Sequence, residues 1–178
     1  MSGSTDGDGA QLQSQLPQSQ LTAEQLLTKL IELIINSQTT DDISKATLET
    51  TFGVRLTRSD SGGERFAARL TANWNVAISF TNYASSGPIA RLAFSSATND
   101  PETPMTDICG IDAEALASAL TDASFERSPV FGIHGERWGA TFTRGPVRID
   151  VGTGGEASEP SEKITHACIK WVAIKSNG

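Results

Sequence analysis

The sequence predicts an α+β domain in which an antiparallel sheet has helices packed on one face. Two observations lead to this prediction. Apolar residues recur at helical spacing in three segments and alternate with polar residues in six others. Turn residues such as those at 85–88 separate neighbouring alternating segments, which is typical of antiparallel hairpins. The 178 residues are enough to bury a core without a metal or a dense disulfide framework.

Three helices are expected. The first begins at Thr22-Ala23-Glu24-Gln25, which has the spacing of a capping box, and extends to about Asn36. The second begins at Thr40 or Asp41 and ends at Gly53. The residues expected on the buried faces of these helices, and of a third helix capped by Asp112, are Leu26, Leu27, Leu30, Ile31, Ile34, Ile43, Leu48, Phe52, Ala115, Leu116, Ala119 and Leu120.

Strands are expected where apolar and polar residues alternate. The alternating segments are 65–72, 76–80, 89–95, 137–143, 147–151 and 164–175. The first two read as a hairpin. Trp74 and Trp138 are candidate anchors for a partner. Trp138 and Trp171 share the phase of apolar neighbours in their strands, so the core is the favoured place for Trp138 and the expected one for Trp171.

The chain contains an internal similarity. Ile43-x4-Leu48-x3-Phe52 matches Ile111-x4-Leu116-x3-Leu120, and residues 63–66 match residues 135–138, each shifted by about 70 residues. This predicts two tandem helix-plus-strands repeats, 40–97 and 108–176. The alternative is an ordinary α+β domain in which the similarity is a coincidence.

The first 20 residues are rich in Ser, Gly, Asp and Gln and predict a disordered tether before a single domain at 21–178. They contain no basic region and no apolar core, so they are not an intact signal peptide. Either Met1 is the native start of a cytoplasmic protein, or it replaces a removed leader or lipid-bearing cysteine of an exported one. Abundant Ser and Thr and only five Lys favour a periplasmic or otherwise exported protein.

Cys109 and Cys168 are the only cysteines, and their spacing fits neither a zinc site nor a redox motif. We expect them to be close in space, because one precedes the third helix and the other lies in the last strand. They are either bonded to each other or two buried thiols.

Composition excludes several classes of function. The net charge of -7 opposes binding to nucleic acid, and the longest apolar run is too short to cross a membrane. The chain has no phosphate-binding loop, nucleophile elbow or metal motif, so no cofactor is expected. His134 and His166 are the only histidines, and each is expected to be solvated or structural.

Charge is distributed unevenly along the chain. Between Arg91 and Arg127 there are seven acidic residues and no Lys or Arg. The alternation directs the Arg side chains of the early and matching later strands away from the helices, onto an open sheet face. These charges are either solvated or form a partner-binding surface, for which the candidates are Asp107, Asp112, Glu114, Asp122, Arg65, Arg69 and Arg137.

The predicted function is a non-enzymatic protein-binding module: an inhibitor, immunity protein or chaperone that binds one protein partner. Because the acidic stretch is the larger uncompensated charge, the partner is expected to carry a basic surface. One alternative is an enzyme or small-ligand binder with a site near His134, Glu136 and Asp150. A second is a structural subunit of an envelope assembly.

Overall fold

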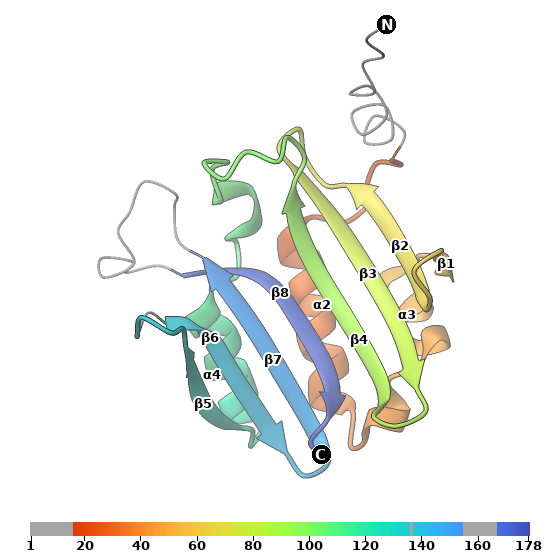
Figure 1. The fold of residues 1–178 in the computed structure, drawn as a ribbon, viewed down its shortest axis with the longest axis vertical. Helices are drawn as coiled ribbons and strands as arrows, with labels where there is room; N and C mark the ends of the chain where they lie inside the picture. Colours follow the sequence, from red (N-terminus) through yellow and green to blue (C-terminus); the bar gives the residue numbers. More distant parts are fainter. Residues whose placement is uncertain (1–15, 136, 155–166) are drawn as a thin grey trace, which may run out of the picture.

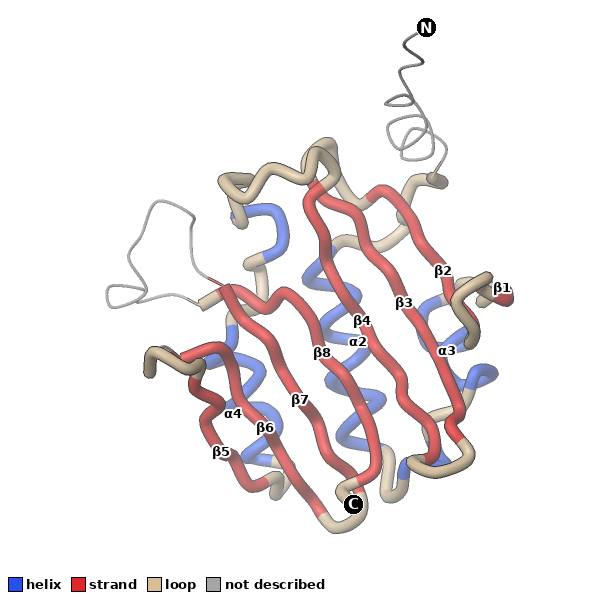
Figure 2. Tube along the Cα trace, viewed as in Figure 1, coloured by secondary structure: helices blue, strands red, loops and turns tan. Residues whose placement is uncertain are grey.

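The structure, a computed structural model, describes residues 16–135, 137–154 and 167–178. Its main feature is an eight-stranded antiparallel sheet with the strand order β1-β2-β3-β4-β8-β7-β6-β5. Figures 1 and 2 show helices α2, α3 and α4 behind this sheet. The prediction of an α+β protein with an antiparallel sheet is confirmed. The strands are β1 Thr57–Arg58, β2 Glu64–Arg69, β3 Trp74–Tyr83, β4 Gly87–Ser96, β5 Glu126–Phe131, β6 Arg137–Arg144, β7 Val147–Gly154 and β8 Cys168–Ser176.

Helix α2 (Ala23–Asn36) begins at the predicted capping box. The backbone N–H of Gln25 donates to Thr22 Oγ1 over 3.2 Å, and the N–H of Thr22 donates to Gln25 Oε1 over 2.9 Å. Helix α4 (Ala113–Asp122) begins, as predicted, at Asp112, whose carboxylate accepts from the N–H of Ala115. These side chains satisfy amide groups that the first turn of a helix leaves unpaired.

The second predicted helix begins later than expected. Thr40–Asp42 form a separate 3-10 turn, η1, and α3 (Lys45–Phe52) is capped by Ser44, whose hydroxyl accepts from the N–H of Thr47. The carboxylate of Asp42 accepts from the N–H groups upstream of η1 and therefore stabilises a turn of its own. The predicted end of the helix at Gly53 is correct, with φ at 66°.

Two strands were not predicted. β1 is only two residues long and exposed. β5 has exposed side chains at five of its six positions and includes Pro129, so it lacks the apolar alternation by which a strand is found in a sequence. β1 forms one edge of the sheet and β5 forms the other.

The core lies between the sheet and the helices. Alternate side chains of the central strands, among them Ile78, Leu92, Ile149 and Val172, are at most 1% exposed. They pack against the apolar faces of the helices in one cluster. The opposite alternation places the other strand side chains on the face turned toward the viewer in Figure 1, which we call the front face.

A disulfide and one arginine join the helical layer to the sheet. Cys109 and Cys168 are bonded, with their Cα atoms 4.9 Å apart, as one of the two alternatives for this pair predicted. The bond joins the segment after the 3-10 turn η2 (Thr106–Ile108) to the start of β8. Arg144, at the end of β6, donates hydrogen bonds to carbonyl groups at the C-terminal ends of both α2 and α4.

Part of the segment predicted as a tether, residues 17–19, pairs with the sheet. The N–H of Arg69 donates to the carbonyl of Pro17 over 2.7 Å, and the N–H of Ser19 donates to the carbonyl of Arg69 over 2.8 Å. Residues 17–19 thus lie against the end of β2, because that end has backbone groups available for pairing. Residues 1–15 are outside the described residues. Within the described ranges, no helix is long and apolar enough to cross a membrane.

Candidate functional site: the front face around Trp171

A row of small residues crosses the front face perpendicular to the strands. The ladder register places one residue of each strand from β2 to β5 opposite the next: Ala67, Ala77, Ala93, Trp171, Gly152, Gly139 and Val130. Five of these seven residues are Ala or Gly, and Trp171 stands among them. An indole on such a row has room to lie along the sheet.

Trp171 occupies the space that Gly152 leaves. A Cβ atom added to Gly152 would lie 2.1 Å from Nε1 of Trp171 and 2.2 Å from Cε2, so only glycine fits beneath this indole. On the other side, the guanidinium carbon of Arg91 lies 4.8 Å from the centre of the ring, which is a cation-π distance. Trp171 is therefore held between two strands that neighbour its own.

The prediction that Trp171 lies in the core is wrong. The prediction assumed that Trp171 points to the same side of the strand as Ile169. The pairing of β8 with β7 shifts between Gly152 and Thr153, however, which leaves Lys170 as an extra residue in β8. This bulge reverses the alternation. Val172 and Ile174 take the buried positions, and Trp171 turns to the front face.

A second bulge places Trp138 on the surface. The pairing of β5 with β6 shifts between Val130 and Phe131, so Trp138 is the extra residue and is 60% exposed rather than buried as predicted. The next residue, Gly139, approaches β7 so closely that a Cβ would lie 1.8 Å from the carbonyl oxygen of Val151. Only glycine permits this bulge.

Exposed apolar side chains gather at this end of the sheet. Five large hydrophobic residues are exposed among the described residues, and four of them lie within residues 130–138. They are Val130 at 42%, Phe131 at 59%, Ile133 at 93% and Trp138 at 60%. We call these four the apolar cluster.

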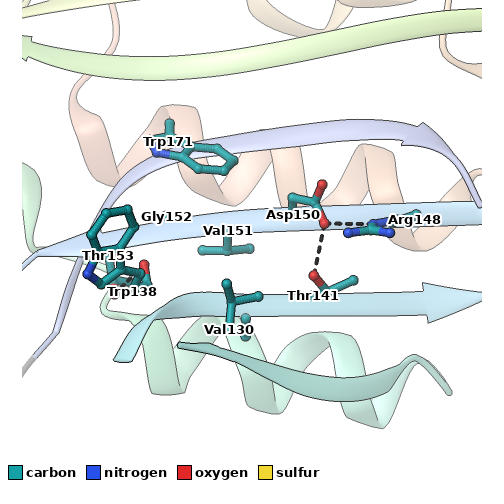
Figure 3. A pocket seen from close by; sticks show the side chains of 10 residues that line it. Val130, Trp138, Thr141, Arg148, Asp150, Val151, Gly152, Thr153 and Trp171 are labelled. Atoms are coloured by element: carbon teal, nitrogen blue, oxygen red, sulfur yellow. Dashed lines mark hydrogen bonds and ion pairs between the residues drawn. The ribbon is translucent and has the colours of Figure 1, made fainter. Parts of the chain in front are cut away.

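Two members of the apolar cluster, Val130 and Trp138, line a hollow of about 370 Å³ on the front face (Figure 3). Trp138 and Trp171 stand at one end of this hollow, and Thr141, Arg148 and Asp150 stand at the other. Val130 lies on the β5 side, and Gly152 contributes no side chain. The hollow therefore combines an aromatic end with a charged end.

The charged end is organised around Asp150, whose side chain is 16% exposed. Its Oδ1 accepts from Thr141 Oγ1 over 2.9 Å and from Arg148 Nε over 2.8 Å, and its Oδ2 pairs with Lys175 Nζ at 2.6 Å. Burial by itself raises the pKa of Asp150, but the hydrogen bonds from Lys175, Arg148 and Thr141 outweigh burial and hold the pKa below its ordinary value. Asp150 is thus a carboxylate that stays ionised and holds two cations in place.

A second hollow of about 680 Å³ lies on the β1–β2–β3 side and is lined in part by Arg58, Arg65 and Asn75. Asn75 is 8% exposed, and its Oδ1 has no hydrogen-bond partner among the described atoms. Arg65 is exposed on the front face, as predicted from the alternation.

The four acidic candidates lie elsewhere, on η2 and α4, and most have contacts within the fold. Asp107 accepts from Thr71 Oγ1 over 2.9 Å, and Asp112 caps α4. Glu114 forms a two-bond ion pair with Arg127 of β5. Asp122 is exposed at the last residue of α4. Asp107 thus lies against Thr71, two residues after Arg69 of β2, whereas Asp112, Glu114 and Asp122 belong to α4 and its cap.

Other predicted residues are not part of the front-face site. Trp74 is 3% exposed, and its Nε1 donates to the carbonyl of Pro104, so it is a core residue rather than an anchor. Arg137 begins β6, but its side chain lies outside the described part of the chain.

The alternative site near His134, Glu136 and Asp150 is described only in part. Glu136 and the second histidine, His166, are outside the described residues. His134 is exposed in the turn between β5 and β6, and Asp150 forms the contacts given above. In the described ranges, no group of three or more His, Cys, Asp or Glu residues could hold a metal ion.

Arg91, Arg148 and Trp171 were not among the predicted site residues. The only sequence feature that could have indicated them is indirect. A glycine, Gly152, directly follows one alternating segment and a tryptophan, Trp171, lies in the next, and the two become cross-strand neighbours when the segments pair. No family model, curated protein or solved structure matches this chain.

Proposed function

We propose that the protein is a non-enzymatic protein-binding module that covers a surface of one protein partner, as an inhibitor, an immunity protein or a chaperone does. The observation that carries the proposal is the apolar cluster, in which Trp138 and Phe131 are each more than half exposed and Trp138 and Val130 line a hollow with a charged end. Exposed apolar groups that gather at one place, with polar groups around them, are characteristic of protein interfaces. Tryptophan and arginine are also the residues that most often dominate binding energy.

The architecture in this proposal is a sheet with helices packed on one face and the other face left for the partner. Two tandem units would form it, each with helical turns followed by four antiparallel strands. The strand order supports this. Strands β1 to β4 run in sequence from one edge of the sheet to its middle, strands β5 to β8 do so from the other edge, and the two sets meet at the β4–β8 pair. Two joined units give a front face wider than either could provide alone.

The edge strand β5 indicates how the partner binds. Pro129, in the middle of β5, has no N–H, so a strand added at this edge would lack a hydrogen bond. Side chains of the apolar cluster, rather than backbone pairing, would then provide the contacts. We also propose that the protein is exported, which the Cys109–Cys168 bond supports because disulfides persist in oxidising compartments.

Site-specific photo-crosslinking in the source cells tests the function. A photoreactive amino acid replaces Ile133, which is 93% exposed within the apolar cluster. The matched control replaces Glu32, which is exposed on α2. We expect a single partner crosslinked from position 133 and none from position 32.

Two results would contradict the proposal. Equal crosslinking from both positions, or none from position 133, would remove the apolar cluster as an interface. Crosslinks from position 133 to a second copy of this chain would favour the alternative of a structural subunit in an envelope assembly.

A further inference from the structure

The front face carries a charge opposite to that of the whole chain. The described strand residues that the register places on this face include five cations, Arg65, Arg69, Arg91, Arg148 and Lys175, and two carboxylates, Glu126 and Asp150. The net charge of the sequence is -7. Among the described strand residues, the front face therefore carries a net positive charge on an acidic chain, and Asp60 of the β1–β2 loop is a further carboxylate that lines the second hollow beside Arg65.

The cations are spaced regularly around the row of small residues. Arg65 and Arg91 lie in one row across the ladders with Ser79 between them, so their Cα atoms are about 10 Å apart, two strand spacings. Asp150 lies in the same row two strands beyond Arg91, with Ala173 between them. Asp150 holds the side chains of Arg148 and Lys175 at the surface; the Arg148 side chain is 41% exposed and that of Lys175 is 35% exposed.

The hollow at Trp171 lies between these cations and the apolar cluster. Its lining of Trp138, Trp171, Val130 and Val151 accepts an apolar group. Arg148 lines the hollow and is held by Asp150, and Arg91 lies against the Trp171 ring, so positive charge is found both in the hollow and next to its aromatic wall. A segment that fills this site has an apolar anchor and negative charge next to the anchor.

We infer that the front face binds an acidic segment of a partner protein, in which an aromatic or aliphatic side chain enters the hollow at Trp171 and flanking carboxylates pair with Arg65, Arg91 and Arg148. Arginine suits this role because its planar group pairs with carboxylates through two hydrogen bonds. The inference rests on the proposed function and specifies the chemistry of the partner.

The inference departs from the basic partner expected from the acidic stretch at 100–126. That expectation counted charge along the sequence. In the structure, Asp112 caps a helix and Glu114 pairs with Arg127, so these two carboxylates already have partners within the fold. Arg148 and Lys175 are also paired, with Asp150, but they lie on the same surface as Arg65, Arg91 and the apolar hollow.

Nuclear magnetic resonance on the full oxidised chain with ¹⁵N-labelled tryptophan tests the inference. The probes are two synthetic peptides of the same length, each with one central tryptophan, flanked by two glutamates on each side in the first and by two lysines in the second. We expect the acidic peptide to shift the indole N–H signals of Trp138 and Trp171, and to leave that of buried Trp74 unchanged. The lysine peptide should shift none of them.

Salt and charge variants provide the controls. Affinity for the acidic peptide should fall about ten-fold between 0.05 and 0.5 M salt, because exposed charges are screened within a few ångströms at high salt. Arg65→Ala and Arg91→Ala should each weaken binding about five-fold, as expected for an exposed ion pair of about 1 kcal/mol. Arg91→Lys keeps the charge but not the two-bond pairing, so it should weaken binding less than Arg91→Ala does. Lys29→Ala removes one positive charge from helix α2 and should change it less than two-fold.

The outcomes separate this inference from the proposed function. Stronger binding of the lysine peptide, no shift at Trp171, or equal effects of Arg65→Ala and Lys29→Ala would overturn the acidic partner. If crosslinking from Ile133 still captures one partner in that case, the proposed function stands and its chemistry is different. If crosslinking fails as well, both are wrong.

Discussion

The stability of the domain should depend on Arg144, which joins three parts of the fold. Its guanidinium donates to the carbonyl of Ala123 over 2.9 Å, to that of Ile35 over 3.1 Å and to that of Ser37 over 2.6 Å. It also lies 4.3 Å from the centre of the Phe125 ring. The carbonyl groups belong to the C-terminal ends of α2 and α4, where the helix dipole favours a cation.

The expected magnitude follows from these contacts. A hydrogen bond to a charged group contributes about 1.5–3 kcal/mol, and a carbonyl left buried without a donor costs about 1–3 kcal/mol. The three contacts are only partly buried and not additive, so we expect Arg144→Ala to lower the free energy of unfolding by about 3–5 kcal/mol. That is a large fraction of the 5–15 kcal/mol typical of a domain. Arg144→Lys keeps the charge but cannot reach both helix ends, and it should cost about 2 kcal/mol.

Urea unfolding followed by circular dichroism, with the disulfide intact, measures this difference. The control is Arg55→Ala, at an exposed position in the loop between α3 and β1, which should change stability by less than about 0.5 kcal/mol. If Arg144→Ala unfolds within 1 kcal/mol of the unmodified protein, water replaces the guanidinium at both helix ends and the reasoning is refuted.

Three further predictions concern other contacts. Gly152→Ala should displace Trp171, because the new Cβ would lie 2.1 Å from its Nε1, and overpacking should cost about 1–3 kcal/mol; unchanged tryptophan fluorescence and stability would contradict this. Replacing Cys109 and Cys168 together by Ser should lower the free energy of unfolding by about 4 kcal/mol in the chain-entropy model, and a loss below 1 kcal/mol in urea would argue against it. Because the folded pKa of Asp150 is lowered, its contribution to stability is present above about pH 4 and lost as pH falls through the folded pKa. Asp150→Asn should remove that part of the pH dependence. If the urea midpoints of the variant and of the unmodified protein change by the same amount between pH 7, 4 and 3, Asp150 does not make this contribution.

The helices could be predicted because their signals are local. A capping box at Thr22, a cap at Asp112 and a glycine at position 53 are each recognised within a few residues. The error at α3 has the same origin, since Thr39–Asp42 have the side chains of a helix cap and form a turn of their own. Local signals place a cap without deciding which of two adjacent turns continues as a helix.

The site could not be predicted because it depends on strand pairing across the sheet. Alternation gives the correct face for Arg65, but it assumes that each strand keeps its phase from end to end. An extra residue at Lys170 and another at Trp138 break this assumption, and neither is visible in the alternation itself. Alternation alone therefore assigns both Trp138 and Trp171 to the core.

The glycines show why these bulges occur where they do. Gly139 and Gly152 are opposite each other on β6 and β7, and each has an atom of a neighbouring strand in the place of its Cβ. At Gly139 that atom is a backbone oxygen, which lets β6 bulge and release Trp138 to the surface. At Gly152 it belongs to the indole of Trp171, which lies flat on the sheet instead of projecting into solvent. Two residues without side chains thus position two large aromatic ones, and these two form the aromatic end of the hollow.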